Sequence, residues 1–158
     1  MLEHTAILIR REGAIWSIAE PVSGRLLGFA RHRLVRGLWC IRWPVRSAWQ
    51  VFEAEDEPLV FTVQRLWRFS AKWEVCDADG HRIALLRSRR VMDASGQQWA
   101  AQELTTQGIW FGASGREFAR ARVINDSVHL DFAPELQVNP LAKMSLLAAV
   151  LVTCGGRA

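Results

Sequence analysis

The sequence lacks the local motifs by which the common classes of enzyme are recognised. It has no Gly-x-Ser-x-Gly nucleophile elbow, no Gly-x-Gly-x-x-Gly dinucleotide loop, no Walker phosphate loop and no His-Glu-x-x-His zinc motif. Catalytic groups can also converge from distant strands, so these absences alone do not exclude an enzyme. Because no residue remains as a candidate for catalysis, the sequence favours a non-enzymatic protein that needs no cofactor.

Cysteine is scarce and shows no spacing pattern. Cys40, Cys76 and Cys154 lie far apart without a Cys-x-x-Cys pair, which argues against a disulfide framework and against a zinc site. The first short apolar stretch of the chain has an acidic residue before it and two arginines after it, the reverse of a signal peptide. We therefore expect a protein of the reducing cytoplasm.

Acidic clusters that could hold a metal ion are also few. Asp77 and Asp79 lie in an Asp-x-Asp-Gly stretch that resembles the start of a calcium loop, but the further ligands of an EF-hand are missing. A polar hairpin turn is the favoured interpretation. The sequence therefore predicts no metal site.

No apolar run is long enough to cross a membrane. The longest spans residues 141–152, which is about 18 Å of helix and includes Lys143, whereas a bilayer requires about twenty apolar residues. Asn139 and Pro140 are typical of a helix start, and Gly155 with Gly156 is typical of a stop. The apolar residues of this segment are distributed around the whole circumference of the helix that they would form. This distribution predicts a buried helix over residues 140–153 and no transmembrane segment.

The rest of the chain consists of short apolar runs that turn residues interrupt about every eight to twelve positions. Several pairs of runs flank a small polar turn that ends in glycine, at Gly80, Gly96, Gly115 and more loosely Gly24, because glycine tolerates the positive φ of tight hairpins. The predicted strands span residues 5–10, 14–19, 25–32, 38–41, 48–53, 59–64, 72–77, 81–87, 99–104, 108–112, 116–122 and 127–132. So many strands must stack or close, and the apolar helix favours an all-β, closed antiparallel barrel that encloses it.

The second half of the chain resembles a known family. The stretches WEVCDADGHRIALLR, FGASGREFARARV and HLDFAPELQVNPLAKMSLLAAVLV are similar to the tubby-like superfamily, in particular its phospholipid scramblase and LURP-one-related branches. These proteins repeat a strand, Asp-x-x-Gly, strand unit and end with a phenylalanine-led acidic turn and an apolar helix, an ending that Phe132, Glu135, Leu136 and Val138 match. The resemblance covers residues 73–153 and implies a twelve-stranded antiparallel barrel around the helix.

The same resemblance implies a function. Tubby proteins bind phosphoinositide headgroups through basic residues, and scramblases are associated with lipid movement and calcium. Asp126 and Glu135 fall at acidic positions of the scramblase calcium motif, but Ile124 occupies another of its positions. The calcium site is therefore not carried over to this chain.

Positive charge is concentrated in one segment. Residues 21–50 contain six arginines and no acidic residue, within a chain of net charge +4, which indicates an anionic partner such as a lipid headgroup or a nucleic-acid backbone. The candidate headgroup ligands are Arg31, Arg33, Arg36, Arg42 and Arg46, and the candidate interface aromatics are Trp39 and Trp43. The alternative is that these arginines form a solvated strand face while the tryptophans, which alternation places on one side, fill the core.

These observations favour one domain over residues 1–158 that binds anionic phospholipid headgroups at the cytoplasmic face of a membrane. The alternative is a soluble protein-interaction domain with no lipid or nucleic-acid role, which an exposed apolar patch without a basic neighbour would favour. Nucleic-acid binding ranks third, because it requires arginines and exposed tryptophans along one groove.

Overall fold

The structure is a computed structural model that describes residues 1–35, 46–53, 58–66 and 71–155. The described residues form twelve strands, one short 3-10 helix and one α-helix. The strands are β1 (Ala6–Glu12), β2 (Ile15–Ala19), β3 (Leu26–Val35), β4 (Arg46–Phe52), β5 (Leu59–Arg65), β6 (Lys72–Asp77), β7 (Arg82–Arg87), β8 (Arg90–Asp93), β9 (Gln98–Thr105), β10 (Gly108–Ala113), β11 (Arg116–Ile124) and β12 (Ser127–Phe132). The helices η1 (Pro134–Leu136) and α1 (Pro140–Gly155) follow.

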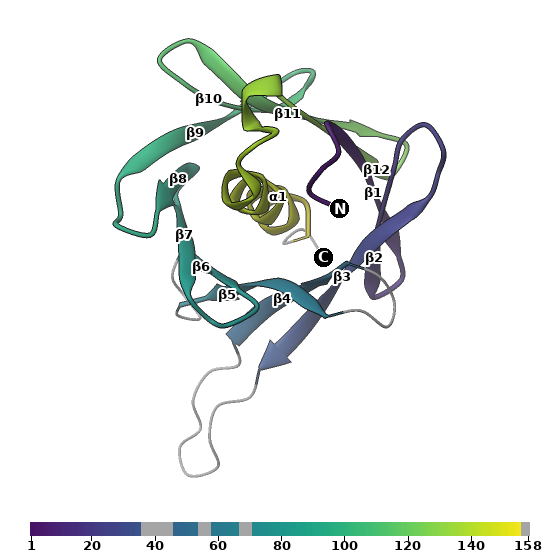
Figure 1. Cartoon of the computed structure of the whole chain (residues 1–158), viewed down its shortest axis with the longest axis horizontal. Helices are drawn as coiled ribbons and strands as arrows, with labels where there is room; N and C mark the ends of the chain where they lie inside the picture. The colour runs from purple at the N-terminus through teal and green to yellow at the C-terminus, as the bar shows by residue number, and fades with distance from the viewer. Residues whose placement is uncertain (36–45, 54–57, 67–70, 156–158) are drawn as a thin grey trace.

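The twelve strands form one closed antiparallel barrel in which each strand pairs with its neighbours in the sequence (Figure 1). The barrel closes between β1 and β12, where Ile7 lies opposite Leu130 and Ile9 lies opposite Val128. Because the first strand pairs with the last, the described strands leave no sheet edge unpaired. The predicted fold class, a closed antiparallel barrel enclosing one carboxyl-terminal helix, is confirmed.

Two of the predicted glycine turns show why the hairpins form where they do. Gly80 and Gly96 have φ angles of 85° and 90°, a left-handed region that glycine enters without a steric penalty. In the first turn, Asp77 Oδ1 accepts the backbone N–H groups two and four residues ahead, at 3.1 and 2.8 Å. Asp93 Oδ1 accepts the equivalent pair in the second turn, both at 2.9 Å. The Asp-x-x-Gly repeat therefore supplies both the backbone freedom and the hydrogen bonds of each turn.

The helix α1 lies inside the barrel, as Figure 1 shows. Asn139 caps its start, because the side-chain Oδ1 accepts the N–H of Ala142 at 3.0 Å. Pro140 occupies the first turn, where a missing N–H removes no helical hydrogen bond. The helix continues to Gly155, slightly beyond the predicted end. Its last turn is supported by Thr153, whose hydroxyl donates to the carbonyl of the residue four positions earlier at 2.7 Å.

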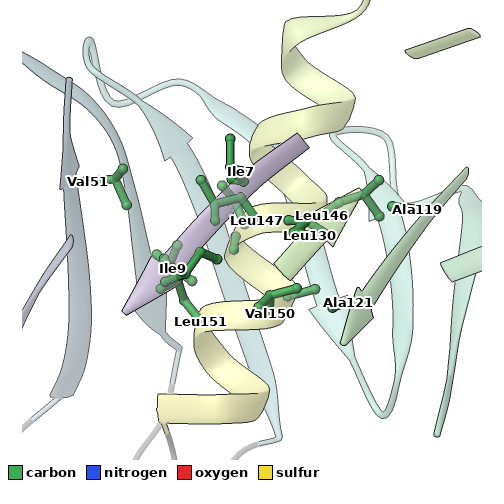
Figure 2. Packing of buried hydrophobic residues seen from close by; sticks show 14 of the residues in the cluster. Ile7, Ile9, Val51, Ala119, Ala121, Leu130, Leu146, Leu147, Val150 and Leu151 are labelled. Carbon is green, nitrogen blue, oxygen red and sulfur yellow. The ribbon is translucent and has the colours of Figure 1, made fainter. Parts of the chain in front are cut away.

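The hydrophobic core fills the space between α1 and the barrel wall. Ile7 and Ile9 of β1 and Leu130 of β12 point inward and lie around Leu146 and Leu147 of α1 (Figure 2). Burying an aliphatic side chain of this size stabilises a protein by about 1.5–3 kcal/mol. The helix is therefore the centre of the core, and among the described residues no helix is long and apolar enough to cross a membrane.

Lys143 is the charged exception within this core. Its side chain is completely buried, and its Nζ donates hydrogen bonds to the carbonyl oxygens of Leu2 and His4, at 2.7 and 3.0 Å. The ring of Phe132 lies 5.3 Å from the same Nζ, within cation–π range. Burial lowers the pKa of the Lys143 ammonium below its ordinary value. The lysine thus fastens α1 to the amino-terminal segment of the chain.

One strand of the structure was missing from the predicted strands, and one predicted strand stays untested. The strand β8 was absent from the predicted strands; it has four residues, of which Val91 alone is buried, so it is too short to show an alternating pattern. The strand predicted over residues 38–41 lies outside the described residues.

Candidate functional site

The end of the barrel at which α1 finishes is rich in positive charge. The described turns at this end, together with the three nearest residues of each described strand, hold ten basic and four acidic residues. The basic residues are Arg10, Arg11, Arg33, Arg46, Arg65, Lys72, Arg87, Arg89, Arg90 and Arg122, and the acidic residues are Glu12, Glu74, Glu103 and Asp126. We call this region the basic end.

The opposite end, where α1 begins, has the reverse composition. The count here follows the same rule and also includes the described segments before β1 and between β12 and α1. This end holds three arginines and nine acidic residues. They are Arg25, Arg82, Arg116, Glu3, Glu20, Glu53, Asp77, Asp79, Asp93, Glu117, Asp131 and Glu135. A helix carries partial positive charge at its start and partial negative charge at its finish, so each end of the barrel complements the helix end that it surrounds.

A row of three cations crosses the outside of the wall at the basic end. Lys72 of β6 lies directly opposite Arg87 of β7, and Arg87 lies directly opposite Arg90 of β8. Directly opposed side chains have Cβ atoms about 4.5–5.5 Å apart, and like charges in such positions are destabilising. We call these residues the basic row. Because departures from favourable pairing concentrate at functional sites, and an anion beside Arg87 and Arg90 would relieve the repulsion between these two arginines, the basic row is a candidate anion-binding site.

The turn between β7 and β8 adds a fourth cation beside the row. Arg89 occupies this turn with a φ of 67°. Arg87, Arg89 and Arg90 are all exposed, and none of them forms an ion pair with another described residue. Three other arginines of the wall do form such pairs: Arg82 with Glu74 at 3.8 Å, Arg120 with Glu117 at 2.6 Å and Arg122 with Asp131 at 2.7 Å. The guanidinium groups of Arg87, Arg89 and Arg90 are therefore available to an anion from solution.

Arg31 and Arg33, two of the predicted headgroup ligands, lie on β3 with their side chains on the outer side of the barrel. The guanidinium carbon of Arg31 lies 4.6 Å from the centre of the Phe29 ring, and this ring stacks on Phe52 at 5.0 Å. Arg31 is thus held on an aromatic platform. Arg33 is exposed, lies opposite Ala48 and forms no ion pair with a described residue.

The structure says less about the other predicted site residues. Arg46 is the first residue of β4, opposite Val35 in the register. The remaining predicted ligands and aromatics lie outside the described residues, between β3 and β4 in the chain; they are Arg36, Trp39, Arg42 and Trp43. Their roles stay predictions.

The basic row and Arg89 were not among the predicted site residues. The signal in the sequence is the run Arg-Ser-Arg-Arg over residues 87–90. Its meaning depends on the strand register, because only the pairing of β6 with β7 brings Lys72 beside it. A single-residue slip in that register would place the lysine on the other face of the sheet.

A cavity of about 720 Å³ opens at the basic end beside the finish of α1. We call it the mouth cavity. Three hairpins and the last turn of the helix contribute its lining, which consists of Arg11, Gly13, Trp16, Leu104, Thr105, Gly108, Ile109, Val123, Asp126, Val128, Thr153 and Cys154.

Two other groups of reactive residues have structural explanations. Asp77, Asp79 and His81 place possible metal-ligating atoms within 4.8 Å of one another, but the hairpin turn already accounts for Asp77, as it does for Asp93 in the equivalent turn. Cys76 is buried in the wall, and burial, followed by the nearby carboxylates, raises the pKa of its thiol. A thiol that stays protonated is a poor nucleophile.

Comparison with known proteins supports the fold. No protein-family model and no curated protein sequence matches the chain. The X-ray structure of a protein from Arabidopsis thaliana is similar, with a TM-score of 0.62 and 14% sequence identity over 92% of this chain and 88% of that chain. A structure of TarM matches 80% of this chain and 21% of that chain at 10% identity, with a TM-score of 0.22 that carries no argument. At such identity, the likeness to the Arabidopsis protein shows a shared fold alone.

Proposed function

We propose that this protein is a non-enzymatic binding domain that attaches to anionic phospholipid headgroups at the cytoplasmic face of a membrane through the basic end. The basic row, with Arg89 beside it, is the observation that carries the proposal. A cation near an anionic membrane surface contributes about 1 kcal/mol, so Arg87, Arg89 and Arg90 together favour the membrane by about 3 kcal/mol, or roughly a hundredfold.

A second group of cations supports the same surface. Arg31 and Arg33 lie on β3, and Arg65 on β5 lies between β3 and the basic row in the strand order. The guanidinium carbon of Arg65 is 5.7 Å from the centre of the Trp73 ring. Cations are therefore spread over several neighbouring strands, a distribution that suits a planar anionic surface better than one small anion.

Exposed apolar residues favour a membrane over a nucleic acid or a purely protein partner. Leu104, Val123 and Ile124 are exposed and lie at the basic end. Among the described tryptophans within three residues of a strand terminus at this end, Trp16 is buried, while Trp73 and Trp110 are half-buried, so none offers a fully exposed stacking surface to bases. A protein-interaction domain would be favoured by an apolar patch away from basic residues, whereas these apolar residues lie among them.

The resemblance to the tubby-like superfamily agrees with this proposal. The expected barrel surrounds the expected helix, and the residues of the matching ending lie between them: Phe132 closes β12, and Glu135 and Leu136 form η1. We therefore propose that the chain is a distant relative of the scramblase and LURP-one-related branches, and that its lipid contact is the basic end.

Vesicle co-sedimentation tests the proposal. At low salt, we expect the protein to sediment with vesicles that contain phosphatidylserine and to stay in solution with neutral phosphatidylcholine vesicles. Replacing both Arg87 and Arg90 by Glu should lower recovery with acidic vesicles by at least about tenfold, because it removes two attractive charges and adds two repulsive ones. Raising the salt concentration should weaken binding of the unmodified protein.

The matched control is the same charge change at the other end of the barrel. Arg25 and Arg116 are exposed arginines near the start of α1, and replacing both by Glu should leave recovery nearly unchanged. Equal recovery of the unmodified protein with acidic and neutral vesicles would refute lipid-headgroup binding and leave the protein-interaction alternative. Equal losses in the two double variants would show that net charge, and not the basic end, attracts the vesicles.

A further inference from the structure

The mouth cavity exists because the described residues leave inward-facing positions at the basic end uncovered. Leu104 is 45% exposed, while its register partner Ile109 is 5% exposed. Val123 is 60% exposed, while its partner Val128 is 3% exposed. Directly opposed residues point to the same side of a sheet, so Leu104 and Val123 belong to the inner face of the barrel. They are core positions for which the chain provides no described covering residue.

The floor of the mouth cavity is rigid and mostly apolar. Trp16 is buried there and packs edge-on against Trp49, with ring centres 5.9 Å apart. The last turn of α1 is fastened to the wall by Gln102, whose amide donates to the Thr153 hydroxyl at 3.1 Å. The cavity is therefore held open by packed elements on the wall and on the helix.

One cation is placed at the rim on the inner side. Arg11 lies opposite Trp16 in the register, so it follows Ile9 on the inward side of β1. Its Nε donates a weak hydrogen bond to the carbonyl of Gly13 at 3.4 Å, and it forms no ion pair with a described residue. The cavity lining also includes one carboxylate, Asp126, in the turn before β12.

We propose that the mouth cavity binds the aliphatic chain of a single-chain amphiphile whose anionic head pairs with Arg11. Leu104, Val123, Ile109 and Trp16 provide apolar contacts for the chain, and the excess of cations at the basic end selects a negative head despite Asp126. A volume of about 720 Å³ lies within the range of about 300–1,000 Å³ typical of small-molecule sites. This site does not depend on attachment to vesicles.

Titration with decanoate, kept below its micelle concentration and followed by calorimetry, tests the site. We expect saturable binding with one site per chain. The Val123→Asp variant should bind decanoate at least about tenfold more weakly, because a carboxylate then lies among the apolar contacts. The matched control is Val22→Asp, since Val22 is 96% exposed in the turn between β2 and β3 at the opposite end and should have no effect.

The role of Arg11 is separated by comparing decanoate with 1-decanol. Arg11→Gln should weaken decanoate binding about tenfold and leave decanol binding unchanged. Equal effects on both ligands would overturn the head-group assignment, and absence of decanoate binding, or equal losses in Val22→Asp and Val123→Asp, would overturn the site. Decanoate binding without vesicle recovery would reject only the proposed function, and vesicle recovery without decanoate binding would reject only this site.

Discussion

Lys143 shows how a single side chain joins α1 to the segment before β1. Two backbone carbonyls of the amino-terminal segment accept its hydrogen bonds inside a core that is mostly apolar. Hydrogen bonds to a charged group contribute about 1.5–3 kcal/mol each, and an acceptor left buried without a donor costs about 1–3 kcal/mol. The lysine therefore offsets the free energy of burying its own charge through hydrogen bonds to two partly buried carbonyls.

Replacing Lys143 by Met removes the donor while keeping a long flexible side chain. We expect the free energy of unfolding to fall by about 2–4 kcal/mol, because the carbonyls of Leu2 and His4 lose their partner while the desolvation of the ammonium is also removed. Urea denaturation measures the change. An unchanged midpoint would contradict the role of Lys143 in fastening α1 to the amino-terminal segment.

The pH dependence of stability gives an independent check on Lys143. Because burial lowers its pKa in the folded protein, the unfolded chain binds this proton more tightly. Stability then rises with pH between the lowered pKa and the ordinary lysine value of about 10.4. The unmodified protein should gain stability relative to the Lys143→Met variant across this window, and a constant difference between the two would argue against the shift.

At the scale of elements, the basic row lowers the stability of the folded protein through like-charge repulsion while it favours binding to acidic vesicles. Arg87 lies between Lys72 and Arg90, so Arg87→Glu would place a negative charge between two positive ones. We expect this variant to be more stable by about 0.5–1 kcal/mol and to bind acidic vesicles less well. Urea denaturation at low and high salt checks the first effect, which salt should reduce. A loss of stability would show that the three cations do not repel one another in the folded protein.

The helix α1 is an element whose burial can be tested directly. Leu147 is completely buried, so Leu147→Asp would place an unpaired charge in the core at a cost of several kcal/mol, comparable with the whole stability of about 5–15 kcal/mol. Thermal melting followed by circular dichroism should show no cooperative transition. The control is Leu141→Asp in the first turn, where the residue is 49% exposed and a negative charge suits the helix start. A folded Leu147→Asp protein would contradict the enclosed helix.

At the scale of the whole molecule, the architecture follows from signals that are local in the sequence. Asp77 and Asp93 each precede a turn glycine by three positions, and Asn139 with Pro140 marks a helix start. An apolar helix without a polar face requires enclosure, and many short hairpins provide it by closing. The barrel could therefore be predicted. The Gly96 turn implied a run before it, but β8 was missing from the predicted strands because a strand of four residues contains too few positions to show alternation.

The candidate site depends on relations that no short stretch of sequence contains. The segment over residues 21–50 stands out by composition, and Arg31 and Arg33 from it do lie on the outer wall. The basic row, in contrast, exists only through the register of β6, β7 and β8. The mouth cavity likewise depends on where α1 finishes relative to the strand ends, and Leu104 and Val123 read in the sequence as ordinary core residues.

The closure of the barrel between β1 and β12 also determines how the chain can fold. β1 is synthesised first and its partner nearly last, so closure is a contact between distant parts of the sequence, and folds of this kind form in about milliseconds to seconds. A helix cannot thread into a finished barrel, so α1 must be surrounded while β1 and β12 come together. Until then the nascent sheet has two open edges that can pair with other chains. The risk of aggregation is therefore greatest after β1 has been synthesised and before β1 and β12 have paired around α1.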